Sequence, residues 1–251
     1  MASGRPLWSK ESAELSPWPD DSLSGELASG LVALAGLPDV SPAVPGLLAR
    51  LVHLTAVLVD PVDYVSVTVA RHGRHLTRAA SDPAAEAVDL AQYAQDDGPC
   101  LTALRSGGPV AVPDIAQAFV WPRFRDVAWQ AGVRASLSIP LFAGSGESVA
   151  ALNLYARDAV AMGILIQHVD ACYRSGGDTP SSPPLDAGSQ QLVAGVDGAL
   201  RTRDLIQRAI GVLMGREGLS AAAAYRHLVE ETPPGAPLTA TAVSIVRQLQ
   251  L

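Results

Sequence analysis

The sequence is short of lysine, cysteine and positive charge. Lys10 is the only lysine among 18 basic residues, and 25 acidic residues bring the formal net charge to −7. A chain of this charge is not a polycation that would bind nucleic acid or anionic lipid along its whole surface. The two cysteines, Cys100 and Cys172, form neither a metal-binding spacing nor a disulfide framework.

The sequence also lacks a long hydrophobic run. No apolar stretch reaches the length of a membrane span, and residues 1–19 contain no hydrophobic core of a signal peptide. Hydrophobic residues make up 48% of the chain and charged residues 17%, which is typical of a globular protein. We therefore expect a cytoplasmic protein without a membrane partner, whose 251 residues form one large or two modest domains.

Motifs of catalysis and of metal binding are missing as well. The five histidines are scattered, and none is spaced from a second ligand as in a metal motif. The glycine-rich phosphate-binding patterns of nucleotide-binding proteins do not occur, and Gly144 and Gly146 are predicted to be turn glycines. The sequence predicts no enzyme activity, no catalytic residue and no metal site, and it leaves the identity of any cofactor unknown.

Hydrophobic periodicity predicts how the first part of the chain is organised. Residues 1–22 mix serine, proline, tryptophan and acidic residues without a period, so we interpret them as a mobile leader. The stretches 23–37 and 41–59 repeat apolar residues at helical spacing. The period then changes, because valines alternate with polar residues over 63–70, which predicts a half-buried strand.

The following segment alternates between predicted strands and helices. A second strand over 75–80 follows a hairpin turn, and Asp82 before Pro83 predicts the start of a helix that continues to about residue 93. Further expected elements are a short helix ending at 105, a short strand over 110–113, a helix over 121–131, strands over 133–142 and 148–155, and a helix over 159–173. Serine, glycine and proline then predict a linker over 174–188.

The C-terminal stretch, from about residue 189, predicts three helices. An apolar stripe at helical spacing continues to Leu213, Gly218 is placed to end this helix, and Ser220 is placed to cap the next one. The prolines between Pro233 and Pro237 then separate a third short helix over 238–249. Gly195 and Gly198 weaken the first of these helices by roughly 1 kcal/mol each relative to alanine.

This stretch resembles the ANTAR domain. The resemblance rests on Arg208-Ala209-x-Gly211-Val212-Leu213-Met214, then on Gly218-Leu219-Ser220 and on Ala224-Tyr225-x-x-Leu228. ANTAR domains are three-helix RNA-binding modules that mediate transcription antitermination. The resemblance therefore implies that residues 189–251 form a coiled-coil helix and an RNA-binding module.

The middle of the chain, from about residue 43 to 172, resembles the GAF domains that precede ANTAR modules in actinobacterial regulators. The motifs that carry this resemblance are Gly98-Pro99-Cys100, Gly108-Pro109-Val110-x-Val112-x-Asp114, Trp121-Pro122-x-Phe124, Gly132-Val133-Arg134-Ala135-Ser136, Ile139-Pro140-Leu141 and Ala151-Leu152-Asn153-Leu154-Tyr155. GAF domains are α/β sensors, often with a ligand pocket. The resemblance implies that residues 23–173 form a sensor domain with N-terminal helices and a small-molecule ligand.

Together the two resemblances imply an α+β protein, with a GAF-like antiparallel sheet flanked by helices and then an all-α three-helix ANTAR-like module. They imply a regulator that binds paired hexanucleotide-loop hairpins in leader transcripts and thereby keeps a terminator from forming. The residues expected to bind RNA stem-loops are Arg208, Gly211, Arg216, Tyr225 and Arg226. The arginines would meet phosphates or guanine edges, the glycine would allow close backbone approach, and the tyrosine would stack on a base.

A homodimer is also expected, because an apolar seam precedes the ANTAR-like module. The residues of this seam, Leu192, Val196, Leu200 and Ile206, are spaced as in a coiled coil. Such a dimer would present two modules to two RNA loops.

Two alternatives stay open. Ile210 stands where ANTAR domains commonly have lysine, Glu230 and Glu231 where basic residues are usual, and Thr239 where an arginine is often found. Residues 189–251 hold six arginines against five acidic residues, a net charge of only +1. These departures favour a sensor or interaction protein that does not bind RNA and uses its C-terminal helices only for dimerisation or partner binding.

The second alternative is a redox sensor. Cys100 lies at the predicted start of a short helix, where the helix dipole can lower the pKa of a thiol. The competing interpretation is a small buried residue, since cysteine is among the residue types most often buried.

Overall fold

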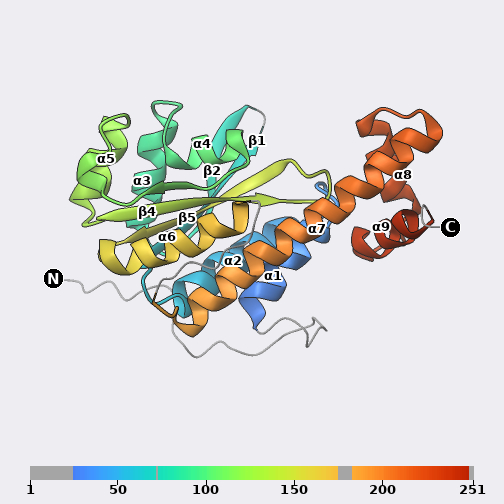
Figure 1. Ribbon diagram of the computed structural model, residues 1–251. Helices are drawn as coiled ribbons and strands as arrows, with labels where there is room; N and C mark the ends of the chain where they lie inside the picture. The colour runs from blue at the N-terminus through green and yellow to red at the C-terminus, as the bar shows by residue number, and fades with distance from the viewer. Residues whose placement is uncertain (1–24, 72, 175–182, 249–251) are drawn as a thin grey trace.

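The computed structural model describes residues 25–71, 73–174 and 183–248. The predicted leader and most of the predicted linker lie outside these residues. The described part contains a five-stranded antiparallel sheet with helices on both faces, followed by a group of three helices at the C-terminal end (Figure 1). The α+β architecture expected from the sequence is confirmed.

The sheet has the strand order β2-β1-β5-β4-β3. Its strands are β1 (Tyr64–Arg71), β2 (Arg74–Ala80), β3 (Val110–Val112), β4 (Ala135–Phe142) and β5 (Ser148–Ala156). The central strands β4 and β5 form a hairpin, and the turn between them covers residues 143–147. This turn contacts α7 at the strand ends that lie nearest the C-terminal helices (Figure 1).

One face of the sheet is covered by α1 (Glu26–Gly36), α2 (Val44–Leu58), α6 (Ala159–Tyr173) and the first half of α7 (Ala187–Glu217). The strand residues on this face are apolar, and they form the main core with leucines and valines of the helices. Because every second residue of a strand points to the same face, this core uses alternate positions of β1, β4 and β5. They are Val65, Val67, Leu137, Ile139, Leu141, Leu152 and Leu154.

The opposite face is covered by α3 (Pro83–Tyr93), α4 (Pro99–Ser106) and α5 (Pro122–Gln130), with the short 3-10 helix η1 (Ile115–Gln117) beside α5. Ser66 and Thr68 on β1 point to this face and are fully buried. The prediction of a half-buried strand over 63–70 is therefore wrong, since α3 packs over the face that its polar residues led us to expect in solvent.

Local signals for helix ends are confirmed. The Asp82 carboxylate accepts a hydrogen bond from the Ala84 amide at 2.7 Å and caps α3. Gly218 ends α7 with φ of 67°, a left-handed conformation that favours glycine. Ser220 then caps α8 (Ala221–Glu231) through the Ala223 amide at 3.3 Å.

Helix α7 joins the two parts of the molecule. Its 31 residues extend about 46 Å. The first half packs along α1, and the second half forms a separate core with α8 and α9 (Leu238–Arg247). No helix in the described part of the chain is both long and apolar enough to cross a membrane.

Candidate functional site

Four of the five residues predicted to bind RNA are exposed on α7 and α8. Arg208, Gly211 and Arg216 lie on α7, and Arg226 lies on α8. Arg208 and Gly211 are three residues apart and share one face of the helix. Within the described part of the chain, Arg208 and Arg226 have no ion-pair partner, whereas Arg216 donates a hydrogen bond from Nη1 to Gln248 Oε1 at 2.9 Å. The first two arginines can therefore meet a ligand outside the chain.

Gly211 lies where the surface of α7 is open. A Cβ built on this glycine would have no heavy atom within 4 Å. Packing inside the chain therefore gives no reason for a glycine in the middle of a helix, where it costs stability. The open backbone would allow an external molecule to approach the helix closely.

The fifth predicted residue, Tyr225, is half-buried and is bound to the sheet-bearing part. Its hydroxyl accepts a hydrogen bond from the Asp39 amide at 3.1 Å and donates one to Asp39 Oδ1 at 3.3 Å. The same carboxylate oxygen accepts the Ser145 amide of the β4–β5 turn at 2.9 Å. Burial, followed by the Asp39 carboxylate, raises the pKa of Tyr225. Its hydroxyl is thus used inside the chain.

Two further residues of α7 bind the β4–β5 turn. Arg203 donates from Nε to the Gly146 carbonyl at 2.9 Å, and its guanidinium carbon lies 4.2 Å from the centroid of the Phe142 ring. Gln207 donates from Nε2 to the Ser145 carbonyl at 2.7 Å. The turn therefore contacts α7 through backbone carbonyls, which do not depend on the side chains of the turn.

The seam predicted for dimerisation lies inside the single chain. Leu192 and Val196 are buried in the main core, and Leu200 is partly buried against it. Ile206 is fully buried in the separate core of α7, α8 and α9. The periodicity correctly marked an apolar face, but α1 and the C-terminal helices of the same chain cover it. A dimer that used Leu192 and Val196 would have to displace α1.

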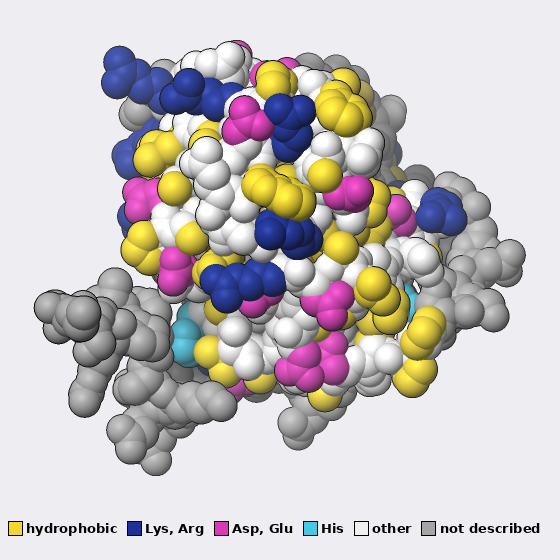
Figure 2. Space-filling view, turned by 90° about the vertical axis from the view of Figure 1, so that its left-hand side faces the viewer, with side chains coloured by type: hydrophobic (Ala, Val, Ile, Leu, Met, Phe, Trp, Pro, Cys, Tyr) yellow, Lys and Arg dark blue, Asp and Glu magenta, His cyan; other side chains and the backbone are white. Residues whose placement is uncertain are grey.

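The end of the molecule opposite α8 and α9 offers no uniformly basic surface. Figure 2 shows this end, with arginine side chains interspersed with acidic and hydrophobic ones. Around α5, Arg134 lies 3.9 Å from the Trp129 ring centroid, Arg125 lies 5.8 Å from that of Phe119, and Arg125 also pairs with Asp126. These arginines are engaged with neighbouring rings and carboxylates, so this face has no clear electrostatic footprint for RNA.

The sheet face beneath α3 and α4 is lined with buried polar side chains. They are Ser66, Thr68, Ser136, Ser138 and Asn153, each at most 1% exposed. Asn153 Oδ1 and Ser136 Oγ have no hydrogen-bond partner within the described part of the chain. Buried polar atoms without partners are unfavourable. Stability alone therefore does not explain this lining.

The buried carboxylate of Asp89 on α3 accepts several hydrogen bonds from side chains of the sheet. Its Oδ1 accepts from the Tyr155 hydroxyl at 2.6 Å and from Asn153 Nδ2 at 3.2 Å. Its Oδ2 accepts from Thr77 Oγ1 at 2.8 Å. Desolvation by burial raises the pKa of Asp89 to about 6, although hydrogen bonds from Tyr155, Ser66, Thr77 and Asn153 oppose this rise.

The donor directions around Asp89 follow from this geometry. Because Thr77 uses its proton on Asp89, Tyr93 must donate to Thr77 Oγ1 at 2.9 Å. Thr68 then donates to the Tyr93 hydroxyl at 2.8 Å, and Asn153 Nδ2 donates to Thr68 Oγ1 at 2.9 Å. The bonds form a closed ring whose donors all lead to one carboxylate.

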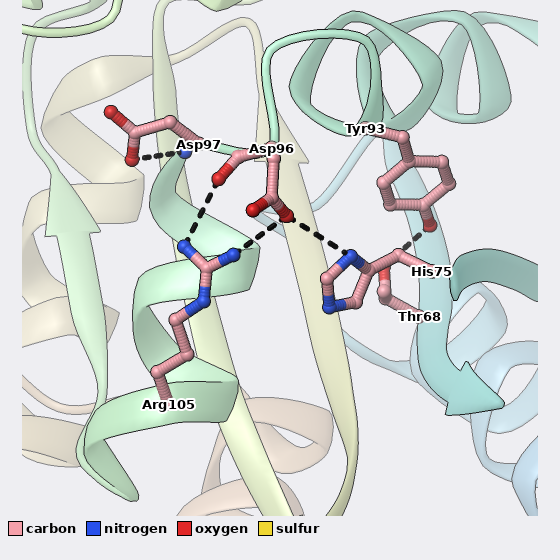
Figure 3. Close-up of polar contacts among 7 residues, drawn as sticks. Thr68, His75, Tyr93, Asp96, Asp97 and Arg105 are labelled. Atoms are coloured by element: carbon pink, nitrogen blue, oxygen red, sulfur yellow. Dashed lines mark hydrogen bonds and ion pairs between the residues drawn. The ribbon is translucent and has the colours of Figure 1, made fainter. Parts of the chain in front are cut away.

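A chain of polar contacts links this ring to the surface (Figure 3). The His75 ring stacks on Tyr93 with centroids 6.2 Å apart, and its Nδ1 lies 3.5 Å from Asp96 Oδ1. Arg105 donates from Nη2 to the same carboxylate oxygen of Asp96 at 2.6 Å. It also donates from Nη1 to the backbone carbonyl of Asp96 at 3.0 Å. The exposed Arg105 is thus connected to the buried Thr68 through the side chains of Asp96, His75 and Tyr93 (Figure 3).

Cys100 does not have the surroundings of a redox sensor. It lies in the first turn of α4, as expected, but it is fully buried beside Leu101 and Ala151. Burial, together with the nearby Asp89 carboxylate, raises the pKa of its thiol, which is opposite to the lowering expected from the helix dipole. Desolvation is the largest cause of this rise. Among the described residues, no group of His, Cys, Asp or Glu side chains could hold a metal ion.

Two family models match the chain. A model described as GAF domain matches residues 44–163, and a model described as ANTAR domain matches residues 194–231. The chain contains a GAF domain and an ANTAR domain. GAF domains are sensors and ANTAR domains are RNA-binding antitermination modules, and both are regulatory rather than catalytic.

Among the solved structures that match the chain is one neighbour from a sensor protein. No curated protein matches the chain. The neighbour is a crystal structure of a domain described as part of a two-component sensor histidine kinase protein from Sinorhizobium meliloti 1021. It is 13% identical, with a TM-score of 0.40, over 67% of this chain and 93% of that chain.

The two matched segments are shorter than the units in which the structure packs. The GAF match begins at Val44 and leaves out α1, although α1 contributes Leu27, Leu31 and Leu34 to the core beneath the sheet. The ANTAR match ends at Glu231, yet α9 completes the core of α7 and α8 with Leu238 and Ile245.

Sequence reasoning missed the residues that join the GAF domain to the ANTAR domain. No prediction gave Asp39, Arg203 or Gln207 a contact between the domains, because their partners lie 57 to 186 positions away and such contacts have no local pattern. It also missed Asp89 and its ring of hydrogen bonds. The buried positions of Ser66 and Thr68 beside this carboxylate would have been a signal, had the strand been recognised as covered on both faces.

Proposed function

We propose that this protein is a cytoplasmic, signal-responsive regulator that binds hairpin RNA and promotes transcription antitermination. The observation that carries the proposal is the ANTAR domain at residues 194–231, on which Arg208 and Arg226 are exposed and have no ion-pair partner among the described residues. A regulator that holds a hairpin in a leader transcript prevents the terminator from forming, so transcription continues.

The proposed RNA-binding residues have distinct roles. Arg208, Arg216 and Arg226 would bind phosphates or guanine edges, for which the planar guanidinium is well suited. Gly211, with open space above its backbone, would let the RNA approach α7. The Tyr225 ring would stack on an unpaired base of the loop.

Two hairpins require two ANTAR domains, so we also propose that the protein acts as a homodimer. Because Leu192 and Val196 are buried against α1, a dimer through these residues requires α7 to leave α1. A dimer of the closed chain would have to use exposed surface instead. Analytical ultracentrifugation of the protein with and without hairpin RNA tests whether the dimer forms.

The input would be a small polar molecule bound by the GAF domain. The polar lining beneath α3 and α4 supports this part of the proposal, because it contains buried acceptors and hydroxyls with unfilled hydrogen-bonding capacity. A ligand there would compete with the bonds that converge on Asp89.

The proposal is tested by crosslinking the protein to cellular RNA and sequencing the recovered transcripts. We expect enrichment of leader transcripts with tandem hexanucleotide loops. The double variant Arg208→Ala/Arg226→Ala should lower affinity for such a hairpin by about tenfold or more, and should reduce the salt dependence by about one phosphate contact for each arginine lost.

The matched control is Arg71→Ala/Arg74→Ala. It removes the same charge from exposed positions at the β1–β2 turn of the GAF domain. RNA affinity equal in both double variants would show that binding depends on net charge, and the assignment of the ANTAR face would be wrong.

The second candidate function is a sensor or interaction protein that does not bind RNA. The exposed Glu230 and Glu231 at the end of α8 favour it, since they place negative charge beside the proposed RNA-binding face. Ile210 is less informative, because it is buried in the core of the ANTAR domain, where a hydrophobic side chain is favoured. Recovery of no RNA above a control protein of similar charge would favour this candidate.

A further inference from the structure

The GAF and ANTAR domains are connected by a small set of polar contacts as well as by α7. We call this set the clamp. Its members are Asp39, Ser145 and Gly146 on the GAF side, and Arg203, Gln207 and Tyr225 on the ANTAR side. One of these residues, Tyr225, is also expected to stack on RNA.

We propose that the clamp holds the ANTAR domain in a closed state that withholds Tyr225 from RNA, and that opening the clamp switches RNA binding on. This inference rests on the proposed function, since it concerns the regulation of the same RNA-binding face. In the closed state the tyrosine is bound to the sensor, and in the open state it can meet a base.

Asp39 is the centre of the clamp. Its Oδ1 accepts both the Tyr225 hydroxyl at 3.3 Å and the Ser145 amide at 2.9 Å, and its own amide donates to the Tyr225 hydroxyl at 3.1 Å. The neighbouring Leu37 carbonyl accepts the Gly144 amide at 2.8 Å. The loop after α1 and the β4–β5 turn are therefore bound to each other, and Tyr225 is bound to both through one carboxylate.

The turn also fits the ANTAR domain closely. A Cβ on Gly144 would stand 2.2 Å from Leu238 Cδ1 and 3.3 Å from the Tyr225 hydroxyl oxygen. Only a residue without a side chain can occupy this position while α8 and α9 stay in place. The turn and the ANTAR domain are therefore closely complementary in shape at this contact.

The clamp is weak enough to open. Its hydrogen bonds lie at the edge of the domain contact and are partly exposed, and each such bond changes an equilibrium constant by about fivefold. A ligand that binds the open form roughly a hundredfold more tightly than the closed form would invert a tenfold preference for the closed form.

The β4–β5 hairpin offers a route from the sensor interior to the clamp. Its strands carry Ser136, Asn153 and Tyr155 of the buried polar face, and its turn carries Ser145 and Gly146 of the clamp. A ligand that takes hydrogen bonds from Asn153 or Tyr155 would shift these strands. This shift would also displace the β4–β5 turn, because paired strands move together.

The test compares three variants of the full chain with the wild type. Asp39→Ala weakens the clamp from the GAF side and leaves the proposed RNA-binding face intact. Tyr225→Phe removes the hydroxyl and keeps the ring, whereas Tyr225→Ala removes both. Asp60→Ala is the matched control, since it removes the same charge from an exposed position of the GAF domain.

Two readouts are measured on each variant. Hydrogen exchange at the amide of residue 39 reports opening of the clamp, because this amide donates to the Tyr225 hydroxyl across the domain contact, and both groups remain in Asp39→Ala. Titration with a synthetic RNA of two hexanucleotide-loop hairpins reports binding. We expect faster exchange in Asp39→Ala, Tyr225→Phe and Tyr225→Ala, but not in Asp60→Ala.

The two substitutions of Tyr225 should change the RNA affinity in opposite directions. Asp39→Ala and Tyr225→Phe should bind RNA about fivefold more tightly than the wild type, and Tyr225→Ala should bind at least about fivefold more weakly. RNA binding that Asp39→Ala leaves unchanged, or unaltered exchange at the amide of residue 39 in this variant, would overturn the inference alone. Absence of RNA binding from every variant, even with faster exchange, would overturn the proposed function and the inference together.

Discussion

Gly195 of α7 lies directly against Ala28 of α1. A Cβ on Gly195 would stand 2.8 Å from the Ala28 Cα and 2.7 Å from Leu31 Cδ1. Gly198 has a similar place one turn later, where a Cβ would stand 2.6 Å from a Val32 methyl carbon. The two glycines that weaken α7 by intrinsic propensity thus allow it to pack closely along α1, and the long helix is fixed to the sensor by this contact.

The first prediction follows from this close contact. Gly195→Ala should lower the free energy of unfolding by about 1–3 kcal/mol, because the added methyl group overpacks the interface with α1, even though alanine favours the helix. Urea unfolding followed by circular dichroism measures the change. An increase in stability would mean that α1 and α7 can separate without cost, contrary to the structure.

A second prediction uses the open glycine of the same helix. Gly211→Ala should raise the free energy of unfolding by about 0.5–1 kcal/mol, since the methyl group meets no atom within 4 Å and alanine favours the helix. If RNA approaches the backbone here, the same variant should bind the hairpin RNA more weakly. A variant that is more stable and binds RNA as tightly as the wild type would remove Gly211 from the proposed face.

Local sequence signals predicted the helices and strands well, because each such signal lies within a few residues of its effect. Asp82 caps α3, Gly218 ends α7 and Ser220 begins α8, as the sequence indicated. The fold class was predicted by the resemblance to GAF and ANTAR domains, which the two matches confirm.

Long-range contacts were not predictable in this way. A stripe such as Leu192 and Val196 shows that one helix face is buried, but not which partner covers it, and here the partner is α1 of the same chain. Polar residues at alternate positions of β1 suggested solvent, although a polar cluster around Asp89 buries them. The bond between Tyr225 and Asp39 joins segments that no periodicity connects.

A third prediction concerns the pH dependence of stability. Burial raises the pKa of Asp89 from its ordinary value to about 6, so between about pH 4 and pH 6 the folded protein holds a proton that the unfolded chain has lost. Unfolding releases this proton, and the free energy of unfolding therefore falls as the pH rises through this window. Its neighbours Tyr93, Tyr155 and Cys100 all have raised pKa values and stay neutral there.

Asp89→Asn isolates this effect. The stability of the variant relative to the wild type should increase by roughly 2 kcal/mol between pH 4 and pH 6.5, because the amide does not ionise. Urea unfolding at a series of pH values measures the difference. A difference that stays constant over the window would show that the Asp89 carboxylate does not titrate with a raised pKa.

A fourth prediction concerns the two thiols. Cys100 is fully buried, whereas Cys172 is partly exposed, and burial raises the pKa of both. In the folded protein a maleimide should label Cys172 slowly and Cys100 not at all, and in urea it should label both. Cys172→Ala should abolish labelling of the folded protein. Labelling that persists in this variant would restore Cys100 as a candidate redox sensor.

The last prediction concerns a histidine that joins α7 to α8. His227 lies 3.0 Å from Glu217 Oε2 through Nδ1 and 3.1 Å from Glu231 Oε1 through Nε2, and these carboxylates, Glu231 first, raise its pKa. Because the folded pKa is above the unfolded one, the stabilisation is fully present below the unfolded pKa and is lost as the pH rises through the folded pKa. His227→Gln should therefore destabilise the protein at about pH 6 and leave it unchanged at about pH 9, and Glu217→Gln should show part of the same effect. Equal destabilisation at both values, measured by thermal unfolding, would mean that packing of the ring, and not its charge, joins the two helices.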